Sequence, residues 1–213
     1  MGVSGQEEIG KILSTSIPRE LMLNFERLYP SALERALQIG RTSDPGHRAS
    51  VAGHNRHFAL NEALMHAFDE CGVERNKLRG NAILIGKVGI SAIARVHMNQ
   101  GKWDNSRRSK AKVNLCRPNR AVASLMQVDW LTPKDQSVDA ITAFLVTQGD
   151  GTDESPAEAF IVVPDESMDL RNPIFVESLN VFLQRYQIVE EVEDSAQPKL
   201  KAGVKRQPDA NES

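Results

Sequence analysis

Two continuous apolar runs, at residues 140–146 (AITAFLV) and 159–163 (AFIVV), are the features that most constrain the fold of this chain. Runs of this length without a polar break are typical of strands that are covered on both faces. The polar, glycine-bearing segment between them is typical of a hairpin connection. If the turn is centred on Thr152, Phe144 and Phe160 face each other across this hairpin.

A second hairpin is predicted between residues 81 and 98, where apolar side chains recur with a period of two. The sequence GKVG at 86–89 is expected to form its turn. In the second strand the alternation places Ala94 and Val96 on one face, and Arg95 and His97 on the other. We therefore expect one face in the core and one face that is partly polar.

Apolar residues at helical spacing predict the elements before this hairpin. A helix is expected to begin near Ser16 and to end at Pro30, and a short helix is expected over 31–39. The turn-forming residues at 42–55 predict a long loop. The next helix is expected to end at Gly72, a residue that suits a helix C-terminus.

Two further helices are predicted in the second half of the chain. The middle one is expected over 107–116, capped by Asn105 or Ser106, and to restart after Pro118. The last one is amphipathic, and its apolar stripe consists of Phe175, Leu179, Phe182 and Tyr186.

The pattern as a whole predicts one α+β domain over residues 16–190, with two antiparallel β-hairpins in one sheet packed by N-terminal, middle and C-terminal helices. With 213 residues and 40% hydrophobic composition, the chain is long enough for one core but not for two large ones. Residues 1–15 are expected to be a flexible lead, and 191–213 a disordered polar tail.

The composition also bears on location. No apolar run approaches the roughly 18 to 20 residues of a membrane span, so we expect no membrane contact. The N-terminus lacks the charge and apolar pattern of a secretory signal. Cys71 and Cys116 are expected to be free thiols, which fits a reducing compartment. The sequence therefore predicts a cytoplasmic protein.

The clearest charge anomaly is the segment 101–120, which has seven basic residues and one acidic residue, a net charge of +6 in a chain of net charge −2. Basic side chains in the first turn of a helix oppose its dipole, which suggests that they serve an anion. We hypothesise a non-enzymatic binding protein whose basic helix contacts nucleic-acid phosphates. The residues of this hypothesis are Arg95, Lys102, Arg107, Arg108, Lys110 and Lys112.

Three alternatives compete with this hypothesis. The basic helix could be solvated, with its charges paired to acids elsewhere on the chain. The protein could be an interaction or assembly subunit whose basic face meets an acidic protein. It could also be a metal-dependent phosphodiesterase or nuclease, if the hairpin of the runs 140–146 and 159–163 brings Asp139 opposite Asp165 at one end of the sheet.

Other motifs are incomplete. His54 and His57 have a chelating spacing, but no paired-cysteine element accompanies them, so packing and capping roles are expected. The glycines at 80–89 lack both phosphate-loop spacings. We therefore assign no catalytic residue, no metal ligand and no cofactor, and the sequence indicates no oligomeric state.

Overall fold

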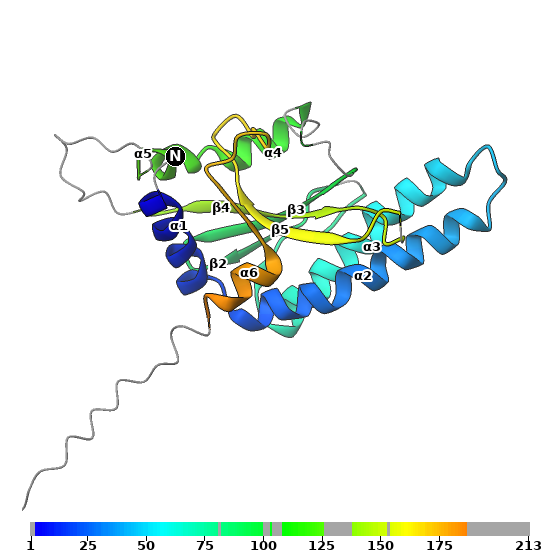
Figure 1. Ribbon diagram of the computed structural model, residues 1–213, viewed down its shortest axis with the longest axis horizontal. Coiled ribbons are helices and arrows are strands. Elements are labelled where there is room, and N and C mark those ends of the chain that lie inside the picture. The colour runs from blue at the N-terminus through cyan, green and yellow to red at the C-terminus, as the bar shows by residue number, and fades with distance from the viewer. Residues whose placement is uncertain are drawn as a thin grey trace, which may run out of the picture.

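The computed structural model describes residues 3–80, 82–99, 103, 108–125, 138–152 and 154–186 (Figure 1). They form one α+β domain, in which an N-terminal helical hairpin and a C-terminal helix pack on a mixed sheet of six strands. The predicted fold class is thus confirmed. The predicted tail at 191–213 lies outside the described residues. No helix in the described part of the chain combines the length and apolarity needed to cross a membrane.

The strands lie side by side in chain order, and one neighbouring pair is parallel. β3 and β4 run parallel, whereas every other adjacent pair is antiparallel. Because parallel strands need a long crossover, the chain between them passes over the sheet and carries two short helices. The strands are β1 (Glu74–Arg75), β2 (Ile85–Val88), β3 (Ser91–Met98), β4 (Ile141–Gln148), β5 (Glu158–Val163) and β6 (Phe175–Ser178). The crossover helices are α4 (Lys110–Cys116) and α5 (Asn119–Leu125).

Both faces of the sheet are covered, as the apolar runs predicted. The long helices α2 (Arg19–Arg41) and α3 (Arg48–Glu70) lie against one face, and α4 lies on the other (Figure 1). Every residue of β4 is buried. Alternate side chains of β4 enter different apolar clusters, Ala143 and Leu145 on the side of α2 and α3, Phe144 and Val146 on the side of α4.

The prediction of two helices separated at Pro30 is wrong, because α2 continues through this proline. Pro30 is exposed, and the apolar stripe of α2 continues past it against α3. This packing outweighs the one backbone hydrogen bond that a proline removes. The loop predicted over 42–55 is also shorter, since α3 begins at Arg48. Gly72, with a φ of +64°, follows the end of α3 as expected.

The prediction of a flexible lead at residues 1–15 is wrong as well. Val3–Ser16 forms α1, and its apolar side chains Ile9 and Leu13 are fully buried. The absence of a long apolar period hid this helix, because only one narrow stripe faces the core.

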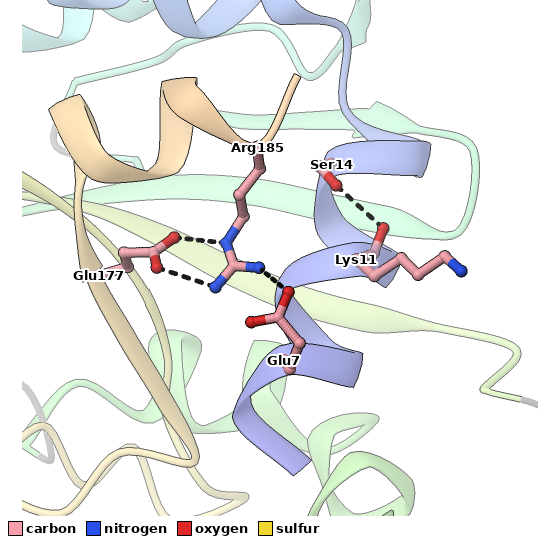
Figure 2. Close-up of polar contacts among 5 residues, drawn as sticks. All are labelled: Glu7, Lys11, Ser14, Glu177 and Arg185. Carbon is pink, nitrogen blue, oxygen red and sulfur yellow. Dashed lines mark hydrogen bonds and ion pairs between the residues drawn. The ribbon is translucent and has the colours of Figure 1, made fainter. Parts of the chain in front are cut away.

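A guanidinium group fastens α1 to the C-terminal elements (Figure 2). Arg185 follows α6 (Leu179–Gln184), and it donates to both carboxylate oxygens of Glu177 in β6, at 2.7 and 2.9 Å. Its third nitrogen donates to Glu7 of α1 at 2.8 Å. Two parallel bonds of this kind fix the plane of the guanidinium group. We call this arrangement the Arg185 clasp.

The two hairpins were predicted correctly in kind, but not in register. β2 and β3 pair as expected, although the turn is limited to Gly89 and Ile90. In the hairpin of β4 and β5, Phe144 lies opposite Val162, and Phe160 lies opposite Val146, so the prediction that Phe144 faces Phe160 is wrong. The turn is centred one residue later than Thr152, which shifts every pair by two positions.

The last predicted helix is too long. Phe175 belongs to strand β6, and the helix α6 begins only at Leu179. The apolar spacing was correct for burial, since Phe175, Leu179 and Phe182 all enter the core. It could not distinguish a strand followed by a helix from one continuous helix.

Asn119 anchors the crossover to the sheet. Its amide nitrogen donates to the carbonyls of Thr142 and Pro164 at 2.9 and 2.8 Å, and its side-chain oxygen accepts from Thr142 N–H at 2.7 Å. Asn119 is fully buried, so these bonds replace water at the restart of the chain after Pro118. Thr142 also donates from its Oγ1 to the carbonyl oxygen of Leu115 in α4, at 2.7 Å. The same residue of β4 therefore holds both α4 and Asn119.

The Arg185 clasp predicts the effect of a methyl group on α1. A Cβ at Gly10 would lie 2.5 Å from Arg185 Cζ, and the guanidinium group cannot yield without losing its carboxylate partners. Gly10→Ala should therefore lower the free energy of unfolding by about 1 kcal/mol, since overpacking outweighs the gain in helix propensity. Gly53→Ala is the control, because open space surrounds this glycine in α3, and it should raise the free energy of unfolding. Urea unfolding measures both. Equal stabilisation by the two substitutions would contradict the clasp.

Candidate functional site: a cationic pocket

The structure separates the basic residues that the sequence grouped together. Arg95 is buried, with 6% of its surface exposed, and Lys112 is partly buried. Arg108 and Lys110 are exposed at the start of α4. The other two predicted residues, Lys102 and Arg107, lie outside the described residues. Arg95 and Lys112 nevertheless meet, because both line one pocket of about 330 Å³.

The pocket lies at an opening in the sheet. β2 pairs only with the first half of β3, from Ser91 to Ala94. Beyond Ala94, β3 continues beside β4 without a β2 partner among the described strands, and Ile83 and Leu84 line the gap. Side chains from α3, β3 and α4 converge there. The polar lining residues are Arg56, His57, Asn61, Arg95, His97, Asn99 and Lys112. We call this site the cationic pocket.

Arg95 is held from α3. Its Nε donates to Asn61 Oδ1 at 2.7 Å, and its Nη2 donates to the carbonyl oxygen of His57. Both partners are neutral. Burial lowers the pKa of Arg95 to about 10, so the side chain remains a cation at neutral pH. The pocket therefore contains a buried positive charge whose hydrogen-bond partners supply no negative charge.

A second arginine is joined to β3 and β4 by a histidine. Arg56 Nη1 donates to His97 Nε2 at 3.0 Å, and His97 Nδ1 lies 3.0 Å from Thr147 Oγ1. Because arginine only donates, His97 Nε2 must be the unprotonated nitrogen, and Nδ1 carries the proton. Burial, and then the charges of Arg56 and Arg95, lower the pKa of His97 to about 3. His97 is thus neutral and orients Arg56.

The electrostatic balance of the pocket is positive. Three cationic side chains line it, and none of its described lining residues is an aspartate or glutamate. Asp150, after β4, is the acid whose charge acts on Arg56 and His97, and its carboxylate accepts hydrogen bonds from Thr152. Burial and the charge of Arg95 lower the pKa of Lys112, as expected for cations that share a site.

Hydrogen-bond donors also exceed acceptors. Arg95 Nη2 and Asn61 Nδ2 lie 3.2 and 3.4 Å from the two ring nitrogens of His57, yet a neutral histidine has only one acceptor nitrogen. The Nε of Arg56 is buried and has no hydrogen-bond partner among the described residues. A pocket with surplus positive charge and surplus donors is complementary to an anion with several oxygens.

The other candidate sites are not assembled. In the described part of the chain, no group of three or more His, Cys, Asp or Glu side chains could hold a metal ion. The register shift removes the geometry that would place Asp139 opposite Asp165. Asp165 instead caps the turn after β5, where it accepts from Ser167 and from the backbone N–H of Asp169. Trp103 packs edge-on against Phe160, at a ring distance of 5.6 Å, and does not line the pocket.

Sequence reasoning missed five polar residues of the pocket: Arg56, His57, Asn61, His97 and Asn99. One signal was present, because Arg95 and His97 lie on the same face of β3 as the buried Ile93 and so face inward. The residues of α3 could not be matched to them, since 38 positions separate His57 from Arg95. Their placement depends on how α3 crosses the sheet.

The lowered pKa of His97 predicts a change of stability with pH. Between pH 6.5, its ordinary value, and about 3, the unfolded chain binds a proton that the folded chain excludes. The free energy of unfolding should therefore fall with decreasing pH, by up to about 1.4 kcal/mol per pH unit from this group. His97→Gln should remove this contribution. The difference in the free energy of unfolding between the wild type and His97→Gln should therefore become smaller from pH 7 to pH 5. Urea unfolding at several pH values tests this, with the exposed His66→Gln as control. If the free energy of unfolding changed equally with pH in His97→Gln and in the wild type, the assignment of this effect to His97 would be wrong.

Comparison of the chain with protein-family models, with curated proteins and with solved structures finds no match. The contacts and charges of the cationic pocket are therefore the observations from which a function follows.

Proposed function

We propose that the protein is a non-enzymatic binding protein that holds nucleic-acid phosphates in the cationic pocket. The observation that carries the proposal is the meeting of Arg56, Arg95 and Lys112 in one pocket whose described lining contains no carboxylate. Cations that serve only the fold are normally paired with acids when they are buried. A bound anion supplies the missing negative charge.

The energetics favour an anion that enters deeply. Arg95 is desolvated by the protein itself, so an anion that reaches it meets a charge already stripped of most of its water. Charge-assisted hydrogen bonds in such surroundings are stronger than neutral ones. The buried Nε of Arg56 has no hydrogen-bond partner among the described residues, so it is a further donor available to a bound anion. The cost of burying the cations is then offset on binding.

Phosphate suits the pocket better than a carboxylate does. The donors approach from three elements, α3, β3 and α4, whereas a carboxylate presents its two oxygens in one plane. The oxygens of a phosphate point in several directions, and arginine and lysine are the side chains that proteins use to bind them. The exposed Arg108 and Lys110 precede Lys112 on the same short segment, and they extend the positive charge to neighbouring phosphates of a polymer.

Sulfate, a stable tetrahedral anion, tests the pocket directly. It should raise the melting temperature of the wild type at constant ionic strength, because it binds the folded state alone. Arg95→Met should abolish this rise, and Lys112→Met, at a partly buried position, should reduce it. Arg120→Ala is the matched control, since Arg120 is an exposed cation of the same segment outside the pocket. An equal rise in the wild type and in Lys112→Met would contradict an anion site here.

A labelled oligonucleotide tests whether the anion belongs to a nucleic acid. Binding should weaken steeply with salt, and Lys112→Met should lower the magnitude of the salt slope by about 0.7 on a single strand. Arg120→Ala should leave the slope nearly unchanged. If an acidic polypeptide such as polyglutamate bound more tightly than the oligonucleotide, the protein would be an interaction subunit for an acidic partner instead.

A further inference from the structure

A second hollow adjoins the cationic pocket on α3. Its volume is about 480 Å³, and it is lined by residues of α3 between Ala49 and Phe58. Gly53 and His57 line both hollows, so the two are neighbours on α3. A ligand that extends beyond the cationic pocket on this side meets the second hollow next. We call it the aromatic hollow.

The lining of the aromatic hollow combines small residues with rings. Ala49, Ser50 and Gly53 are small, and a Cβ added to Gly53 would meet no atom within 4 Å. The rings are those of His54, His57 and Phe58. Phe58 is 42% exposed, and its ring meets that of His57 edge-on at 5.5 Å. The face of an exposed phenylalanine is a stacking platform for a base.

We propose that the nucleic acid is single-stranded, and that a base next to the phosphate in the cationic pocket stacks on Phe58. This inference rests on the proposed function. It uses the two chemistries by which proteins hold single strands, positive charge for the backbone and an aromatic ring for the bases. A duplex keeps its bases stacked and paired, and its stiff backbone cannot bring a phosphate to the buried Arg95.

A strand fits these surfaces better than a free nucleotide does. The cationic pocket and the aromatic hollow together account for one phosphate and one base. Arg108 and Lys110 are exposed before Lys112, and they offer contacts to further phosphates, which only a polymer carries. The charge beyond the pocket thus points to a strand that continues past it.

The experiment compares four probes by fluorescence anisotropy and competition: an oligothymidine, the same length as duplex, the same length with abasic sites, and thymidine monophosphate. The wild type should bind the oligothymidine more tightly than the other three. Phe58→Ala should weaken oligothymidine binding by about five- to hundredfold, and it should leave abasic binding unchanged. Phe58→Tyr, which keeps the ring, should restore the affinity. Phe58 is largely exposed, and an unchanged sulfate-induced rise in melting temperature shows that the variant is folded.

The outcomes separate the inference from the proposed function. If Phe58→Ala weakened abasic and base-bearing strands equally, or weakened neither, base stacking on Phe58 would be wrong while phosphate binding stood. If thymidine monophosphate bound as tightly as the oligothymidine, a free nucleotide would replace the strand. If the wild type bound neither the abasic strand nor sulfate, the proposed function itself would fall, and this inference with it.

Discussion

The parallel pairing of β3 with β4 is the constraint on which the rest of the structure depends. The two strands pair from Ser91 with Ile141 to Met98 with Gln148, along the whole length of both. Antiparallel neighbours can be joined by a tight turn, whereas a parallel pair requires the chain to return across the sheet. That return places α4 over the face opposite α2 and α3 (Figure 1). Asn119 fixes the crossover to the backbone of Thr142, near the start of β4. The described basic residues Arg108, Lys110 and Lys112 thus lie on the crossover, beside the sheet.

The cationic pocket results from the same arrangement. β3 extends beyond β2, so the inward-facing Arg95 and His97 lie at an opening instead of deep within a continuous sheet. α3 contributes Arg56 from one face of the sheet, and α4 of the crossover contributes Lys112. No single element carries the site, and none of the described lining residues neutralises it. Replacing buried charges by apolar residues of similar volume is often neutral or stabilising, so the cost of these charges supports the proposed role in binding.

The sequence predicted those features that depend on local pattern. The buried runs of β4 and β5, the hairpin before them and the restart after Pro118 were all predicted, because burial and turn chemistry act over a few residues. Continuation of α2 through Pro30, the docking of α1 and the two-residue shift that separates Phe144 from Phe160 were missed. Each depends on packing between distant segments. The basic segment was found by its charge alone, but Arg56, His57 and Asn61 became visible as the partners of Arg95 and His97 only when α3 was placed against β3.

The Arg185 clasp has a consequence for how the protein is made. Glu7 and Arg185 are 178 positions apart, so α1 leaves the ribosome long before its partner is translated. At ordinary elongation rates the delay is roughly 10 to 35 s. Ile9 and Leu13 are fully buried in the folded domain, but during that interval neither β6 nor α6 is present to cover them. The nascent chain thus exposes the narrow apolar stripe of α1, a suitable surface for a chaperone, until β6 and α6 are translated and cover it.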